Sequence, residues 1–204
     1  RSVWTARMDM KTPGNRLKMA QRYLEKRDYD GARQAFEQVI ELSPNDGAAR
    51  QALARLAYER QDYAEMVRHL LDLFRDGQLS GGSDETAQVY YDSEGRRHGA
   101  HDEVRVWALA ASRDPAIAAR LKDGQTDEDA DLRIMLSSLT GDWDVLDKEL
   151  RRRIESTPYD PIIWTLWARS REHAGQWADA AKAWEQVRRL QQTTIARRRE
   201  ELKL

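Results

Sequence analysis

A short polar turn that ends in an aromatic residue occurs four times in this chain. Arg27-Asp28-Tyr29 and Gln61-Asp62-Tyr63 start 34 positions apart, and so do Gly141-Asp142-Trp143 and Gly175-Gln176-Trp177. Each turn lies between two segments whose apolar residues recur at the three- and four-residue intervals of one helix face. A fixed period in this range indicates stacked helical hairpins, each of which buries its apolar face against the next.

The apolar residues on both sides of these turns define the core that we expect. In chain order they are Leu17, Ala20, Tyr23, Leu24, Ala32, Phe36, Val39, Ile40, Leu53, Ala54, Leu56, Ala57, Met66, Leu70, Leu71, Leu73, Phe74, Leu132, Met135, Leu136, Leu139, Leu146, Leu150, Ile154, Ala168, Ala180, Ala181 and Val187. Proline ends two hairpins, at Pro44 and Pro158, because it cannot continue a helix. Tryptophans also fall at packing positions and are expected in the core, namely Trp107, Trp143, Trp164, Trp167, Trp177 and Trp184.

The pattern divides the chain into five stretches. We expect an N-terminal extension that contains Trp4 at 1–12, two hairpins at 13–79, an irregular helical hairpin with a loop insertion at 80–126, two further hairpins at 127–194, and the end of a polar capping helix at 195–204. Within the irregular stretch, Ser83 is expected to cap a helix that contains Val89, Tyr90 and Tyr91. The predicted fold is therefore an all-α, right-handed solenoid of antiparallel helical hairpins with a C-terminal capping helix.

These repeats resemble the tetratricopeptide repeat. The pattern of that family has small residues where the two helices approach, aromatic residues between hairpins and a closing proline. The first unit matches it with Ala20, Tyr23, Ala32, Phe36 and Pro44, and the last with Trp164, Trp167, Ala168, Ala180 and Trp184. Two positions depart from it, because Met66 replaces a small residue and Arg133 stands where an aliphatic residue is expected.

The resemblance implies a concave groove, lined by the first helix of each hairpin, that binds a peptide or a helix of a partner protein. The residues at the family's groove positions are Leu17, Gln21, Leu24, Gln51, Arg55, Tyr58, Thr165, Arg169 and Glu172. The Lys and Asn cluster with which chaperone adaptors of this family hold a C-terminal carboxylate is missing. The alternative for each of these residues is a solvated helix face. Modules of this kind also occur beside membrane anchors in bacterial envelope assemblies, which is the context that the resemblance implies.

Motifs of the common catalytic and cofactor sites are missing from the sequence, so we expect neither an enzyme nor a cofactor. It has no glycine-rich phosphate loop, Gly-x-Ser-x-Gly elbow or His-Glu-x-x-His helix. Having no cysteine, it can form no disulfide or thiolate metal site. His98 and His101 are residues that bind zinc, but such spacing is common by chance, and we expect a polar loop without metal. His69 and His173 stand alone on helices and are expected to be surface or capping groups.

The charge and hydropathy of the sequence limit the classes of partner that we expect. The formal net charge is −1, so no global field attracts nucleic acid. Glu200 and Glu201 lie among the basic residues near the C-terminus, and aromatic residues are absent there, so we expect a solvated cap. No apolar run is long enough to insert into a membrane. The chain begins with Arg1 rather than Met, which leaves open an upstream signal or anchor and a cytoplasmic or a periplasmic location.

Three hypotheses about function follow from these observations. The first is a non-catalytic scaffold, monomeric or weakly self-associating, that binds a protein or peptide partner in its groove. The second is a self-assembling structural module that uses its end faces or the loop at 78–103, where Tyr90 and Tyr91 lie. The third is a metal- or nucleic-acid-dependent function through His98 and His101 or through the arginine-rich helix. The repeat itself favours the first.

Overall fold

The computed structural model describes residues 12–79, 90–91, 97–98 and 100–201 of this 204-residue chain. The chain forms two compact units, residues 1–79 and residues 80–204, and each is described here by itself. Several expectations fall outside the described residues, among them nearly all of the N-terminal extension with Trp4, the proposed cap Ser83, and Val89.

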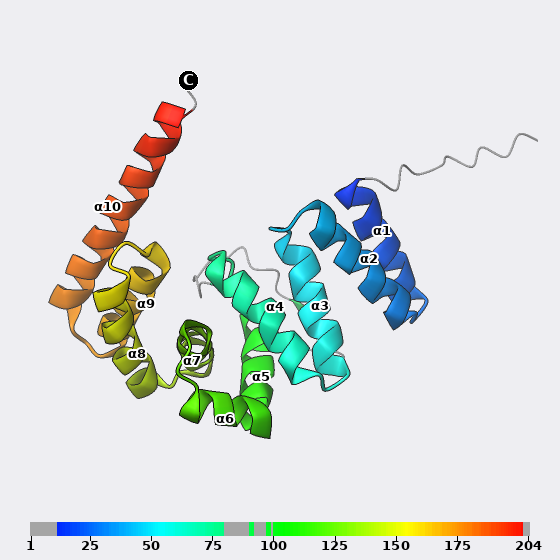
Figure 1. The fold of residues 1–204 in the computed structure, drawn as a ribbon, viewed down its shortest axis with the longest axis horizontal. Helices are drawn as coiled ribbons and strands as arrows, with labels where there is room; N and C mark the ends of the chain where they lie inside the picture. The colour runs from blue at the N-terminus through cyan, green and yellow to red at the C-terminus, as the bar shows by residue number, and fades with distance from the viewer. Residues whose placement is uncertain (1–11, 80–89, 92–96, 99, 202–204) are drawn as a thin grey trace, which may run out of the picture. The chain divides into compact units, whose positions relative to one another are not determined.

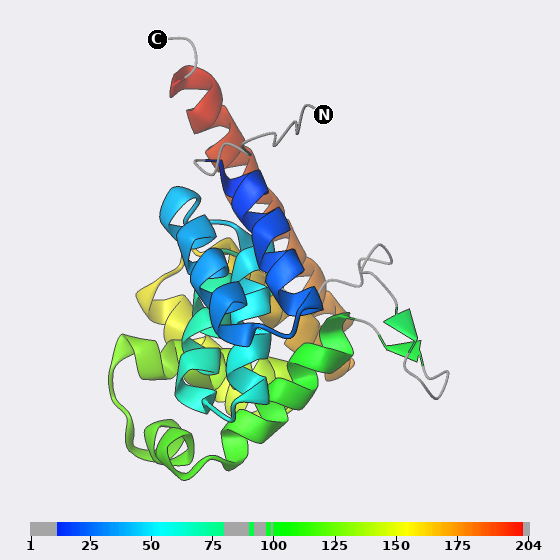
Figure 2. The ribbon, with the colours of Figure 1, turned by 90° about the vertical axis from the view of Figure 1, so that its right-hand side faces the viewer.

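The first unit consists of two helical hairpins. It contains α1 (Pro13–Glu25), α2 (Tyr29–Leu42), α3 (Gly47–Glu59) and α4 (Tyr63–Arg75). In Figures 1 and 2, where this unit is blue to cyan, α1 and α2 lie side by side and antiparallel. The alanines predicted at close approaches are fully buried, as shown by Ala20, Ala32 and Ala54, and so are predicted apolar residues such as Val39 and Leu70. Leu17, Tyr23, Leu24 and Ile40, also predicted in the core, are only partly buried. Small side chains let the helix axes approach closely, and the larger ones fill the space between them.

The second unit contains the remaining helices and a short β-ribbon. Its elements are β1 (Tyr90–Tyr91), β2 (Arg97–His98), α5 (Ala100–Arg113), α6 (Pro115–Asp123), α7 (Asp127–Thr140), α8 (Trp143–Ser156), α9 (Pro161–His173) and α10 (Trp177–Glu201). Hairpins form from α7 with α8 and from α9 with α10, around buried residues such as Leu132, Leu150 and Ala168. The C-terminal half of α10 continues past α9 in both views (Figures 1 and 2). The predicted all-α class, with antiparallel hairpins and a C-terminal capping helix, is confirmed.

The helix predicted across Tyr90 and Tyr91 is wrong. These two residues form β1, which pairs antiparallel with β2, Tyr90 opposite His98 and Tyr91 opposite Arg97. Tyrosine favours the pleated backbone of a strand, and the sequence Asp92-Ser93-Glu94-Gly95 between the strands has the composition of a hairpin connection. His98 therefore lies in a strand and His101 in the first turn of α5, where the sequence had predicted a single polar loop.

The aspartate in the repeated turn is a helix cap. Its carboxylate accepts a hydrogen bond from a backbone N–H in the first turn of the second helix of each hairpin. The distances are 2.9 Å from Gly31 N to Asp28, 3.0 Å from Glu65 N to Asp62 and 3.3 Å from Val145 N to Asp142. Such a bond satisfies one of the N–H groups that have no partner inside the helix. This role explains why Asp recurs at the same place in three of the four turns.

The tryptophans differ in burial more than the sequence predicted. Trp107 is 2% exposed, as expected, but Trp177 is 69% exposed, so its predicted core position is wrong. Both Trp143 and Trp177 begin the second helix of a hairpin. The Trp143 ring stacks on His173 of the following hairpin, with 4.4 Å between ring centroids, whereas α10 is the last described helix and no described hairpin follows it to cover Trp177.

Candidate functional site

Six of the predicted groove residues lie on the first helices of the hairpins in the first unit. They are Leu17, Gln21 and Leu24 on α1, and Gln51, Arg55 and Tyr58 on α3. None of them is buried, and Gln21 and Arg55 are exposed. Leu17 and Leu24 pack partly against the core of the unit. The Arg55 Nε atom lies 3.4 Å from the Glu59 carboxylate, an ion pair along the helix surface. This face combines a charged surface with half-buried apolar edges.

The other three predicted residues form one face of α9. Thr165, Arg169 and Glu172 are half-buried and follow one another at intervals of four and three residues, which places them on one side of the helix. The Thr165 hydroxyl donates to the Pro161 carbonyl at 2.7 Å, and the Glu172 carboxylate accepts from Trp184 Nε1 at 2.7 Å. Burial lowers the pKa of Arg169, and the nearby Glu172 carboxylate opposes this effect. Arg169 is thus a partly desolvated cation.

The structure places the two sets in different units. The residues on α1 and α3 belong to the first unit and those on α9 to the second. Within each set none of the side chains is buried, whereas Ala20, Ala54 and Ala168 on the same helices are fully buried. A single groove lined by all nine residues stays a prediction.

A cluster of charged residues around Trp167 was missed by sequence reasoning, which placed Trp167 simply in the core. The guanidinium groups of Arg171 and Arg151 lie over its ring, 4.2 and 5.3 Å from the centroid. Asp147 forms ion pairs with both arginines, and Arg171 also donates to the Gln176 side chain at 2.7 Å. Cation–π contacts of this kind gain strength when they are desolvated. The sequence signal was the four-residue spacing of Asp147 and Arg151 and of Trp167 and Arg171.

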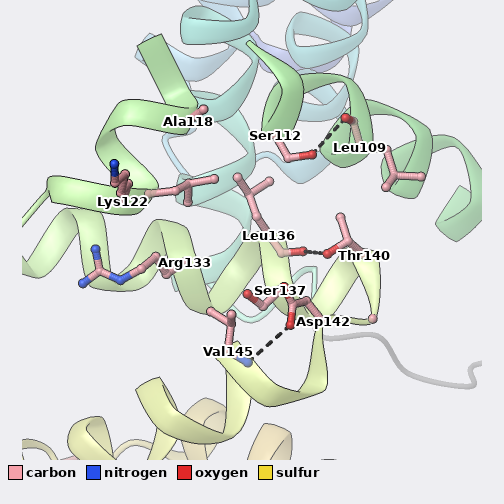
Figure 3. Close-up of a pocket in the computed structure, with 12 residues that line it drawn as sticks. Leu109, Ser112, Ala118, Lys122, Arg133, Leu136, Ser137, Thr140, Asp142 and Val145 are labelled. Carbon is pink, nitrogen blue, oxygen red and sulfur yellow. Dashed lines mark hydrogen bonds between the residues drawn. The ribbon is translucent and has the colours of Figure 1, made fainter. Parts of the chain in front are cut away.

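An open cavity of about 580 Å³ lies between α5, α6, α7 and α8 (Figure 3). We call it the α5–α8 cavity. Its lining residues are Leu109, Ser112, Ala118, Leu121, Lys122, Arg133, Leu136, Ser137, Thr140, Gly141, Asp142 and Val145. In the close-up, Lys122 and Arg133 lie on the left, Leu109 and Thr140 on the right, and Val145 at the bottom. The sequence did not predict it.

Arg133, the main departure from the repeat pattern, borders this cavity. Its guanidinium donates to the Gly124 carbonyl at 2.8 Å and lies 3.3 Å from the buried Glu149 carboxylate. The positive charge of Arg133, at a position where the family has an aliphatic side chain, is therefore balanced by two groups. These are the Glu149 carboxylate of α8 and the Gly124 carbonyl in the connection before α7. Ion pairs that are only partly exposed are screened less by solvent and salt than surface pairs.

His69 is buried on α4, which contradicts the predicted surface position. The Glu65 carboxylate lies 4.0 Å from its Nε2 atom, and its Nδ1 atom has no hydrogen-bond partner among the described residues. Burial lowers the pKa of His69 below the usual 6.5. The charge of Arg68 and, more weakly, that of Arg50 act in the same direction, while the carboxylates of Glu65 and Asp72 oppose it.

We expect acid to destabilise the wild type more than a His69→Leu variant. Because the folded-state pKa is depressed, the unfolded chain takes up a proton first, and stability falls as the pH drops from 6.5 through the folded-state pKa. Urea unfolding at about pH 7.5 and about pH 5.5 measures this difference, since the variant lacks the titrating group. Parallel pH dependence of the two proteins would show that His69 is protonated equally in both states.

Metal and membrane sites were sought in the described part of the chain. It holds no group of three or more His, Asp or Glu residues placed to bind a metal ion. None of its helices has the length and apolar content that a bilayer-spanning segment requires.

Comparisons with known proteins support the repeat. Residues 23–74 match the family model described as "Tetratricopeptide repeat". No curated protein matched the chain. Among solved structures, the chain is similar to PilW, titled a widely conserved type IV pilus biogenesis factor, at 15% identity over 88% of this chain and 78% of PilW, with a TM-score of 0.34. It is also similar to MamA protein, at 12% identity over 93% and 96% of the two chains, with a TM-score of 0.33.

The matched segment coincides with the helical hairpins of the first unit. Residues 23–74 run from the end of α1 to the end of α4, so they include one complete turn-to-turn period of the repeat. Its small and large packing residues, such as Ala32, Phe36, Ala54 and Leu70, are buried. Residues 23–74 therefore match a tetratricopeptide repeat.

Proposed function

We propose that this protein is a non-catalytic scaffold that binds a segment of a partner protein on the first-helix faces of α1, α3 and α9. The tetratricopeptide repeat at residues 23–74 supports a protein-interaction scaffold in general. We also propose that the protein acts within a bacterial membrane-associated assembly. The identity of a captured partner tests this part of the proposal.

One observation supports the choice of face. On each of these helices the predicted residues reach the surface, while an alanine one position away is fully buried, for example Ala54 beside Arg55 and Ala168 beside Arg169. The core therefore uses one side of the helix and leaves the other for contact. This face offers cations at Arg55 and Arg169, and half-buried apolar area at Tyr58. Its chemistry suits a partner segment that combines carboxylates with apolar side chains.

A crosslinking pull-down from the native extract tests the proposal. We expect the double variant Arg55→Glu plus Arg169→Glu to capture at least about tenfold less partner than the wild type, because like-charge repulsion replaces two favourable contacts. Captured proteins are identified and quantified by mass spectrometry, and circular dichroism checks that the helix content is unchanged.

A matched charge reversal on the second helices serves as the control. Arg68→Glu plus Arg188→Glu changes two cations whose side chains are 67% and 69% exposed on α4 and α10. We expect this variant to retain capture. A partner that the Arg55/Arg169 variant also retains would contradict the proposed face. Concentration-dependent oligomers without any partner would favour the self-assembling alternative.

A further inference from the structure

The position of α6 leaves one side of α5 uncovered. The second helices α2, α4 and α8 have 14, 13 and 14 residues, whereas α6 has nine. A single residue, Asp114, connects α5 to α6, and its carboxylate caps α6 by accepting from Ala116 N at 3.0 Å and Ile117 N at 3.1 Å. In both ribbon views α6 crosses the end of α5 instead of running back along it (Figures 1 and 2). The place of an antiparallel second helix is therefore vacant along much of α5.

Apolar side chains are exposed along this vacant place. Val106 and Leu109 lie three residues apart on α5 and are 51% and 36% exposed, and Val145 of α8 is 38% exposed. Leu109 and Val145 line the α5–α8 cavity, with Leu136 between them (Figure 3). Isolated exposed apolar residues are ordinary, but a strip that leads into a cavity marks a contact surface.

Three cations flank the strip, whereas the acidic residues of α5, Asp102 and Glu103, lie in its first turn, away from the cavity lining. Arg105 and Arg113 are exposed on α5, four residues before and after Leu109, and the exposed Lys122 lines the cavity from α6. The acidic residue of the lining, Asp142, is engaged as the cap of α8. A partner with carboxylates beside its apolar residues complements this rim.

We propose that the α5–α8 cavity is a second docking site, which accepts one acidic amphipathic helix of a partner protein. That helix would lie where a regular hairpin places its second helix, with leucine-sized side chains toward Leu109 and Val145 and carboxylates toward Arg105 and Lys122. With 14 residues, α5 is about 21 Å long, so it matches a partner helix of about four turns. This site goes beyond the first-helix faces and does not depend on them.

Two synthetic peptides test the site. Both are helical, about four turns long, and carry leucines at intervals of three and four residues; one has glutamates on its polar flanks and the other has lysines at the same positions. Fluorescence anisotropy measures their affinity for the full chain. We expect the glutamate peptide to bind at least about tenfold more tightly than the lysine peptide, because only its charges complement the rim.

Variants of the lining locate the binding. Leu109→Asp plus Val145→Asp should weaken the glutamate peptide at least about tenfold, and Lys122→Glu should weaken it severalfold. These side chains are partly exposed, so circular dichroism should show unchanged helix content. Ile195→Asp replaces an exposed apolar residue on α10 and should bind like the wild type.

Several results would overturn the site. These are equal or undetectable binding of both peptides, or full affinity in the Leu109/Val145 variant. Sedimentation that shows dimers of the wild type, lost on Leu109→Asp, would mean that a second copy occupies it. The Arg55→Glu plus Arg169→Glu variant should keep full affinity for the glutamate peptide, and a loss there would assign the peptide to the first-helix faces instead.

Discussion

Replacement of Asp147 by alanine is expected to destabilise the protein by about 3 kcal/mol, the cost of leaving a buried cation without its anion. Arg171 is 7% exposed, and Asp147 is its ion-pair partner from the neighbouring helix. The variant also removes the acceptor of the Ser170 hydroxyl, at 3.3 Å. Arg171 would keep Gln176 and the Trp167 ring, which is why we place the cost at the lower end of the range for broken buried pairs.

Urea unfolding monitored by tryptophan fluorescence measures this cost. Adding Arg171→Met to Asp147→Ala should recover most of the lost free energy, because the uncompensated charge is then gone. Arg151 pairs with the same aspartate but is largely exposed, so Arg151→Met should cost less than about 0.5 kcal/mol. If Asp147→Ala unfolds at the same urea concentration as the wild type, Arg171 does not need its anion.

The helical hairpins could be predicted because their signals are local. The period of 34 positions locates the turns, and Asp28, Asp62 and Asp142 cap the helices that follow. Helix periodicity then assigns Ala20 and Ala54 to the inner side and Gln21 and Arg55 to the outer side of the same helices, as the structure shows. The candidate groove residues were instead taken from the family's groove positions, and none of them is buried.

Features that depend on partners distant in the sequence could not be predicted in the same way. Asp147 and Arg171 are 24 positions apart, and nothing in the local pattern of either joins them. His69 lies on α4 beside the polar face formed by Glu65, Arg68, Asp72 and Arg75, so the local pattern does not decide whether its side chain is buried or exposed. The α5–α8 cavity arises from the direction of α6. The one-residue connection at Asp114 determines this direction, and helix periodicity does not predict it.

Trp107→Ala and Trp177→Ala make the same chemical change at two positions that the sequence had treated alike. We expect Trp107→Ala to cost about 3–5 kcal/mol, because it removes a fully buried ring on α5 and leaves a cavity. Trp177 is 69% exposed at the start of α10, so Trp177→Ala removes little buried area and should change stability by less than about 0.5 kcal/mol.

Both variants are measured by thermal and urea unfolding beside the wild type, with helix content from circular dichroism. The comparison separates burial from residue type, since both substitutions lose the same atoms and only the surroundings differ. Nearly equal losses would mean that Trp177 is covered in solution, by a partner copy or by residues outside the described part of the chain. The expected inequality would instead show that Trp177 is exposed in solution, in contrast to Trp143, the other turn tryptophan, which is half-buried and stacks on His173 at the end of α9.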